Sequence, residues 1–156
     1  MIVVLQRCSY ASVSVADRLV NQIDNGICLL CGLVKSDQEA DLNYLAHKIT
    51  HLRIFADSLG KLNLDIKQAN GEVLAISQFT LCADTHKGHR PSFSSAMPPD
   101  LAQKMFGLFV QKLRNYSLTV KEGMFGATME VCIHNDGPVT IILDSRYAKP
   151  LDKLPL

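Results

Sequence analysis

The chain has 156 residues, of which 47% are hydrophobic and 20% are charged, with a formal net charge of +1. This length and composition are those of one globular domain with its own core. The near-zero charge excludes a broadly basic nucleic-acid-binding surface, so any RNA contact must come from a few local lysines and arginines.

The cysteines do not form a pattern typical of disulfide-bonded proteins, because they are odd in number and irregularly spaced. We expect reduced thiols at Cys8, Cys28, Cys31, Cys82 and Cys132. The start of the chain lacks the pattern of a signal peptide, and no apolar run approaches the roughly 20 residues that span a bilayer. We therefore expect a cytoplasmic protein without a membrane segment.

The first third of the chain predicts strands and then a helix. β-Branched and apolar runs favour strands over 2–8, 11–15, 18–24 and 27–34. Asn25-Gly26 between two of these runs is typical of a β-hairpin. Ser36 and Glu39 fit a helical capping box. The helix that follows has one apolar face, made of Leu42, Leu45, Ile49 and Leu52.

The rest of the chain predicts a second helix among further strands. We expect a short strand over 52–56, a central strand over 72–81, and strands over 118–125, 127–134 and 138–144. Pro98-Pro99 begins a helix with apolar positions Leu101, Met105, Leu108, Phe109, Leu113 and Tyr116. The predicted fold class is mixed α/β: a single domain, 1–156, in which barrel-like sheets of about seven strands pack with two main helices, and 146–156 form a tail.

The first segment whose residues could form an active site runs from the predicted strand into the long loop 82–99. The strand ends in Ser77-Gln78-Phe79-Thr80-Leu81, where exposed backbone amides could stabilise an oxyanion. Lys87 and Arg90 in the loop could hold phosphates. A core strand with a solvated basic loop explains the same residues equally well.

The second segment is Asn135-Asp136-Gly137-Pro138-Val139-Thr140, which reads as a turn between strands. Pro138 has no amide to donate, so the next strand begins at an edge or a special bend. Gly137 tolerates unusual backbone geometry, and a cis bond before Pro138 is one option. A simple turn is the alternative.

Together the two segments resemble the signature motifs of the D-aminoacyl-tRNA deacylases, in the bacterial-type form. Supporting segments are Gln6-Arg7, Ala11-Ser12-Val13, Arg53–Asp57, Gly60–Asn63 and the Lys87–Phe93 loop. The resemblance covers all but the tail. It implies a homodimer in which a cis Gly137-Pro138 pair enters the partner's active site, where backbone carbonyls accept from the substrate's α-ammonium group.

The resemblance also implies how the enzyme works. Gly137, Pro138, Val139 and Thr140 would bind substrate and reject L-amino acids, because a rigid backbone tolerates a hydrogen but clashes with a β-carbon. Glycyl-tRNA would then be a substrate beside D-aminoacyl-tRNA. The 2′-hydroxyl of the terminal adenosine would assist catalysis, with Ser77, Gln78, Phe79 and Thr80 in the site and the amides around Phe79 and Thr80 facing the oxyanion. No cofactor, metal or DNA partner is expected.

Other assignments of the same residues remain open. Thr80 could be the nucleophile of a small esterase if His86 or His89, oriented by Asp84, activated it; Cys82 would need a lowered thiol pKa. The chain could also be a non-catalytic nucleic-acid-binding module that uses the basic loop.

Two pairs of residues resemble metal sites, and two polar residues suggest a supporting role. We expect Cys28 and Cys31 to be buried thiols on opposite faces of a strand, and His47 and His51 to be surface histidines without a third ligand. Arg7, in an otherwise apolar strand, needs a partner; we expect it to brace the Gly137-Pro138 loop by bonding carbonyls. Asn135 is expected to support the same loop.

Overall fold

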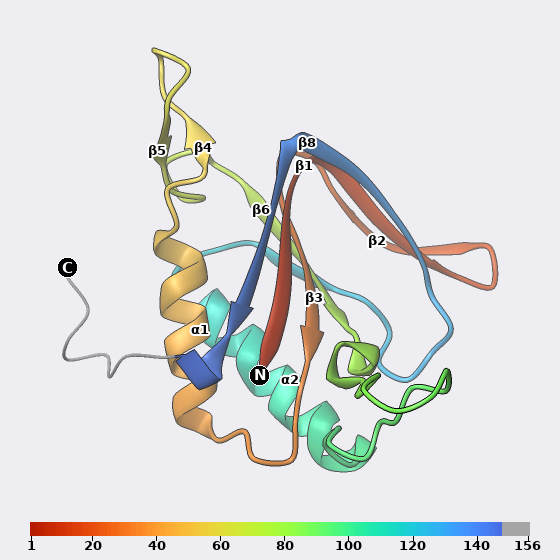
Figure 1. The fold of residues 1–156 in the computed structure, drawn as a ribbon. Helices are drawn as coiled ribbons and strands as arrows, with labels where there is room; N and C mark the ends of the chain where they lie inside the picture. The colour runs from red at the N-terminus through yellow and green to blue at the C-terminus, as the bar shows by residue number, and fades with distance from the viewer. Residues whose placement is uncertain (148–156) are drawn as a thin grey trace.

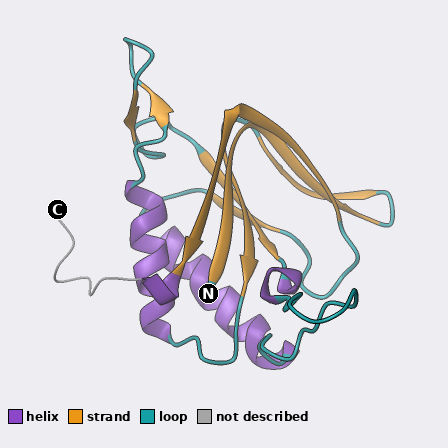
Figure 2. Cartoon of the chain, viewed as in Figure 1, coloured by secondary structure: helices purple, strands orange, loops and turns teal. Residues whose placement is uncertain are grey.

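A six-stranded sheet with two helices on one face forms the body of the molecule, as a computed structural model that describes residues 1–147 shows (Figure 1, Figure 2). The elements are β1 (Ile2–Val15), β2 (Arg18–Ile23), β3 (Gly26–Gly32), α1 (Glu39–His51), β4 (Phe55–Ala56), β5 (Leu62–Leu64), β6 (Glu72–Ser77), α2 (Pro99–Arg114), β7 (Val120–Glu122) and β8 (Glu130–Asp144), with 3-10 turns η1 (Phe79–Cys82) and η2 (Ser145–Tyr147).

The long strand β1 organises the sheet. One edge of β1 pairs with β3 through residues 2–8 and with β2 through residues 11–15. The predicted strands 2–8 and 11–15 are therefore a single strand, β1. The hairpin lies at Ala16-Asp17, whose φ values of 47° and 61° suit a primed turn. The predicted Asn25-Gly26 hairpin is wrong, because β2 and β3 follow one another along the same edge of β1.

Gly26 is required for a different reason. A β-carbon at Gly26 would stand 1.9 Å from the carbonyl oxygen of Glu72, so only glycine lets β6 approach β3 this closely. β6 then runs parallel to β3, and β7 runs parallel to β6. Both helices lie on one side of the sheet, where their apolar faces pack against β1, β3 and β6 (Figure 2).

β8 covers the other edge of β1 along almost its full length. The predicted strands 127–134 and 138–144 are therefore two halves of one strand. Cys8 pairs with Asn135 and Gln6 pairs with Thr140, so that residues 136–139 all stand opposite Arg7. The predicted turn at 135–138 is instead a bulge inside β8, because both flanking halves pair with the same strand.

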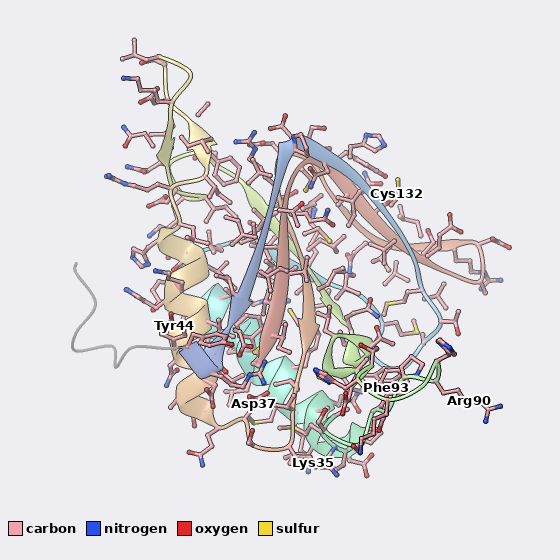
Figure 3. The ribbon with its side chains drawn as sticks, in the orientation of Figure 1. Lys35, Asp37, Tyr44, Arg90, Phe93 and Cys132 are labelled. Atoms are coloured by element: carbon pink, nitrogen blue, oxygen red, sulfur yellow. The ribbon has the colours of Figure 1, made fainter. Side chains whose placement is uncertain are left out.

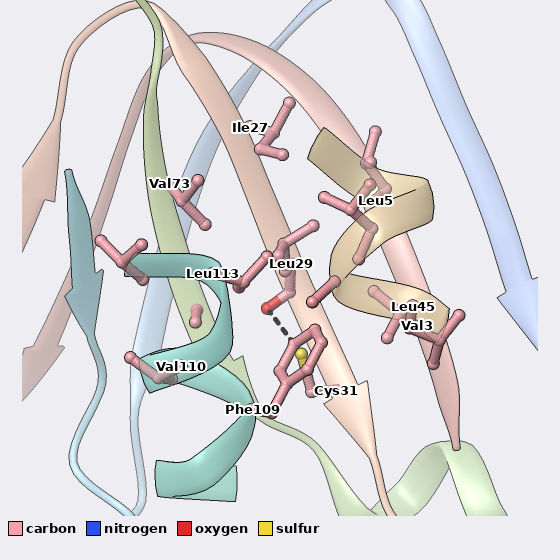
Figure 4. Close-up of a cluster of buried hydrophobic side chains, with 14 of the residues drawn as sticks. Val3, Leu5, Ile27, Leu29, Cys31, Leu45, Val73, Phe109, Val110 and Leu113 are labelled. Atoms are coloured by element: carbon pink, nitrogen blue, oxygen red, sulfur yellow. Dashed lines mark hydrogen bonds between the residues drawn. The ribbon is translucent and has the colours of Figure 1, made fainter. Parts of the chain in front are cut away.

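Two apolar cores lie on the two faces of the sheet. The larger one joins the sheet to both helices, with the fully buried Phe109 at its centre (Figure 4). The smaller one lies on the opposite face and contains Cys8, Ala11, Val13, Ile23, Cys28, Leu74 and Ile76. Cys31 belongs to the first core and Cys28 to the second, which confirms that these buried thiols point to opposite faces.

The helices differ from the sequence prediction in their details. α1 begins after Gln38, whose amide donates to the Asp41 carboxylate, so the capping pair lies two residues after the predicted Ser36 and Glu39. In α2, the predicted core residue Leu101 is exposed, whereas Phe106 and Val110 are buried. The mixed α/β class with two main helices is confirmed; eight strands lie within residues 1–147. The predicted tail lies outside the described residues from 148 onward.

Candidate active site

The end of β6 opens into a cavity of about 520 Å³. Its lining is mainly apolar and comes from the segment after β3, the end of β6, the long loop, the start of α2 and the turn after β7. The lining residues are Cys31, Leu33, Lys35, Ser77, Gln78, Phe79, Phe93, Ser94, Ala96, Met97, Pro98, Pro99, Ala102, Phe125 and Gly126. A cavity of this size can hold a small ligand or the end of a larger one.

The predicted strand 72–81 ends at Ser77, four residues early. The Gln78 amide donates to the Cys31 carbonyl at 2.7 Å, after which the chain turns into η1 and Leu81 N donates back to the Gln78 carbonyl. The first amides of such a turn have no acceptor within it, so those of Phe79 and Thr80 are available to a ligand.

The side chains at this strand end form one polar and one aromatic contact. Gln78 Nε2 donates to Thr80 Oγ1 at 2.5 Å. Phe79 is 59% exposed and packs edge-on against Phe93, with 5.1 Å between ring centroids. The structure thus brings Ser77, Gln78 and Phe79 together at the cavity, with Thr80 exposed beside them.

Lys87 and Arg90 lie at the tip of a loop that is closed at its base. Asp84 and Ser92 exchange two backbone hydrogen bonds, of 2.8 and 2.9 Å. Arg90 projects away from the body, whereas Phe93, at the base, lines the cavity (Figure 3). Both predicted tRNA-contacting residues are exposed, in the loop that follows the strand end.

The Gly137-Pro138 peptide bond is cis, and both residues are exposed at the bulge of β8. Asn135 bridges the base of the bulge, since its Nδ2 lies 3.3 Å from the Val139 carbonyl and 3.4 Å from Thr140 Oγ1. Asn135 therefore holds the two arms of the bulge together, as a supporting residue would.

Arg7 fills the space beneath the bulge. Its side chain is only 10% exposed, Nε lies 2.9 Å from Asp136 Oδ2, and Nη1 donates to the Ile54 carbonyl at 2.5 Å. The predicted bracing by bonds to loop carbonyls is thus replaced by an ion pair to the Asp136 carboxylate. A β-carbon on Gly137, whose φ is 116°, would stand 2.7 Å from Arg7 Nη2.

The two motifs lie at opposite ends of β3 within one chain. Cys8, beside the bulge, pairs with Gly26 at the start of β3, whereas Ser77 pairs with Cys31 at its end. Five residues of strand separate these pairs, which is on the order of 17 Å. Figure 1 shows the bend of β8 at the top and the segment that follows β6 at the lower right.

The other candidate groups are structural. Burial raises the pKa of Cys8 to about 11 and that of Cys28 to about 12, and it also raises the pKa of Cys82, so these thiols stay protonated. His47 and His51 stack at 4.2 Å beside Tyr116. Within residues 1–147, no three His, Cys, Asp or Glu side chains gather as a metal site would require.

Sequence reasoning missed part of the cavity. Lys35, Met97 and Phe125 come from three separate segments and meet only in the fold. Lys35 follows directly after a buried strand, which is the one local signal that would have drawn attention to it. None of the described helices is long and apolar enough to cross a membrane.

Comparison with known proteins identifies the family. Residues 4–144 match the family model described as D-Tyr-tRNA(Tyr) deacylase. The chain is 50% identical over 143 residues to a D-aminoacyl-tRNA deacylase of Thermosipho africanus, covering 92% of this chain and 96% of that protein. It is 51% identical over 149 residues to one of Staphylococcus aureus, covering 96% and 99%.

Two solved structures share the fold. One, described as a c-Myc DNA unwinding element binding protein, is 40% identical with a TM-score of 0.87, covering 92% of this chain and 98% of that one. The other, a probable eukaryotic D-amino acid tRNA deacylase, is 16% identical with a TM-score of 0.78, covering 91% and 97%. The chain therefore belongs to the D-Tyr-tRNA(Tyr) deacylase family, enzymes that hydrolyse the ester bond of D-aminoacyl-tRNA.

Proposed function

We propose that this enzyme hydrolyses D-aminoacyl-tRNA in the cytoplasm at a site completed across a homodimer. The observation that carries the proposal is the separation of the Gly137-Pro138 bulge from the cavity at Ser77–Phe79 within one protomer. A two-fold dimer can place the bulge of each copy at the cavity of the other, which gives two equivalent sites. Ile142, 72% exposed on β8, supports a partner on this strand.

The bulge has the properties of a chiral selector. Asn135 bridges its arms and Arg7 fills the space behind it, so its backbone is held from two sides. A fixed backbone leaves room for the hydrogen of a D-amino acid but not for the side chain of an L-amino acid. Glycine has no β-carbon, so glycyl-tRNA, including glycine mischarged on tRNA(Ala), passes the same filter. The backbone of Val139 and Thr140 extends this excluding surface.

The chemistry requires positioning more than a protein nucleophile. The amides of Phe79 and Thr80 stabilise the tetrahedral oxyanion, and the 2′-hydroxyl of the terminal adenosine assists the attack. A nucleophilic threonine would need a base within hydrogen-bond reach. Asp84 does orient the His86 ring, at 2.7 Å, but Thr80 Oγ1 accepts from Gln78, and within residues 1–147 no hydrogen bond joins Thr80 to a histidine. An orienting role for Thr80 is therefore favoured over the esterase alternative.

The direct test is ester loss from three substrates. Incubated with D-tyrosyl-, L-tyrosyl- and glycyl-tRNA, the enzyme should deacylate the first and third and spare the second. Equal turnover of both tyrosyl isomers would contradict the chiral filter. Thr80→Val should keep most turnover; loss of many orders of magnitude with substrate binding intact would support a threonine nucleophile instead.

The shared site is tested by complementation. Gly137→Leu damages the bulge, and Phe79→Pro removes an oxyanion amide; each homodimer should be inactive. When the two variants are dissociated and mixed, about half of the dimers that form are heterodimers. Each heterodimer has one site with both motifs intact and one with both damaged, so about a quarter of wild-type activity should return. A mixture as inactive as its parents, with heterodimers shown by mass spectrometry, contradicts a cross-subunit site.

A second candidate is nucleic-acid binding without turnover. It is supported by the exposed Lys87 and Arg90 and by the 40%-identical solved structure, which is named as a DNA unwinding element binding protein. It predicts retention of DNA or tRNA with all three esters intact. The net charge of +1 disfavours it, because affinity for nucleic acid without a defined site depends on many phosphate contacts.

A further inference from the structure

The cavity at the end of β6 contains one charged side chain. Fifteen residues of the described part, 1–147, line it; Lys35 is the single charged one among them, and none is a carboxylate. Burial raises the pKa of the Cys31 thiol, so this second titratable group stays neutral. The lining therefore carries one positive charge at neutral pH.

Lys35 is held in place by its backbone. Its amide donates to the Ser95 carbonyl at 3.0 Å, and the preceding amide, that of Val34, donates to the buried Asp37 carboxylate at 2.7 Å. The Met97 amide donates to the Leu33 carbonyl at 3.0 Å and so adds a second hydrogen bond between the same two segments. The ammonium itself is exposed, and within residues 1–147 it forms no ion pair. The backbone contacts therefore hold Lys35 at the cavity, and its ammonium group keeps three donors for an anion bound there.

The charges of the substrate identify that anion. The carboxyl group of the amino acid is esterified and neutral, and its α-ammonium group is positive, so Lys35 repels that end. The anion nearest to the ester is the phosphodiester on the 5′ side of the terminal adenosine. Lys35 also lies beyond Cys31, which pairs with Ser77, so the cation and the proposed oxyanion amides belong to one cavity.

We propose that Lys35 binds the phosphate of the terminal nucleotide and so fixes the direction in which the aminoacyl end enters the cavity. The proposal rests on the proposed function and deepens it by assigning a positioning residue. It also separates two kinds of RNA contact: Lys35 binds one defined phosphate, whereas Lys87 and Arg90 lie on an exposed loop.

A pair of stable ligands tests this directly. The probes are 3′-(D-tyrosylamino)-3′-deoxyadenosine, whose amide resists hydrolysis, and the same compound with a 5′-methyl phosphate. Calorimetry should show that Lys35→Met weakens binding of the phosphorylated probe about fivefold, as expected for one exposed ion pair, and leaves the other probe unchanged. Lys35→Arg should restore the affinity. Lys104→Met, an exposed lysine of α2 outside the cavity, is the matched control.

The salt dependence provides a second readout. Loss of one phosphate contact to a single-stranded end should reduce the slope of log Kd for tRNA against log salt by about 0.7 in Lys35→Met. An equal loss of affinity for both probes, or none, overturns the assignment. Because binding is measured without turnover, an enzyme that fails to deacylate D-tyrosyl-tRNA contradicts the proposed function while leaving this test readable.

Discussion

Arg7 Nε lies 2.9 Å from Asp136 Oδ2, which ties the middle of β1 to the bulge of β8 from beneath. The same guanidinium donates to the Ile54 carbonyl, so Arg7 also fixes the segment that leads into the β4–β5 hairpin. Removing it should loosen the bulge without touching the cavity at Phe79. We expect Arg7→Met to lower the ratio of D- to L-tyrosyl-tRNA turnover at least tenfold. The same substitution should lower the free energy of unfolding by about 1–3 kcal/mol.

The loss of selectivity is the informative part of that measurement. Arg114→Met removes another arginine that is ion-paired, at 2.8 Å to Glu122, but remote from the bulge. It should leave the D/L ratio unchanged. If Arg7→Met destabilises the protein while keeping full selectivity, Arg7 is a packing residue only.

Gly137→Ala should damage the bulge locally. The new β-carbon would stand 2.7 Å from Arg7 Nη2 and 2.9 Å from Val139 Cγ2, at a φ of 116° that L-residues rarely adopt. We expect a loss of about 1–3 kcal/mol in the free energy of unfolding and at least tenfold slower deacylation of D-tyrosyl-tRNA, measured by urea titration and ester loss.

Gly107→Ala is the matched control for this substitution. Gly107 lies in α2 with open space around its missing β-carbon, so alanine should stabilise the protein by about 0.5–1 kcal/mol and leave turnover unchanged. Similar effects of the two substitutions would show that the Gly137 position is not special.

Among residues 1–147, Asp37 is the most deeply buried carboxylate that forms an ion pair. It binds the Met1 amino group, which also donates to Ser145 Oγ at 2.6 Å, and it accepts from the Val34 amide. Asp37→Ala leaves a buried cation without its partner, so it should cost about 3–5 kcal/mol in the free energy of unfolding. Glu39→Ala, which removes an exposed partner of Lys112, should cost less than about 1 kcal/mol. Equal costs in chemical denaturation would contradict a buried pair.

The stability of the enzyme should fall in mildly acidic solution, in part through His47. Burial, then the neighbouring His51 and Lys48, hold the pKa of His47 below its ordinary value of 6.5. The unfolded chain therefore binds a proton more readily than the folded one. The contribution of His47 is fully present above pH 6.5 and declines as the pH falls below it.

Urea unfolding at pH 7.5, 6.5 and 5.5 measures this dependence. His47→Gln should lose less stability between pH 6.5 and 5.5 than the wild type does. His89→Gln, on the exposed loop tip, should retain the wild-type dependence. A pH dependence that is the same in all three proteins would remove His47 as its source.

The amino-acid sequence by itself determined the local elements and the identity of the two motifs. Periodicity was sufficient to predict a helix after Ser36, although its cap lies two residues later, and it also predicted the helix that begins at Pro98-Pro99 and most strands, because this signal acts over a few residues. The burial of Cys28 and Cys31 on opposite faces also followed from strand geometry alone.

Only the tertiary structure decided which strands pair and which residues share a cavity. Asn25-Gly26 and Asn135–Pro138 both carry the local signature of a hairpin, yet one permits the close approach of β6 and the other is a bulge opposite Arg7. Lys35 joins Phe79 through contacts between segments distant in sequence. Such pairings depend on the free energy of the whole sheet, to which each short window of sequence contributes only a part.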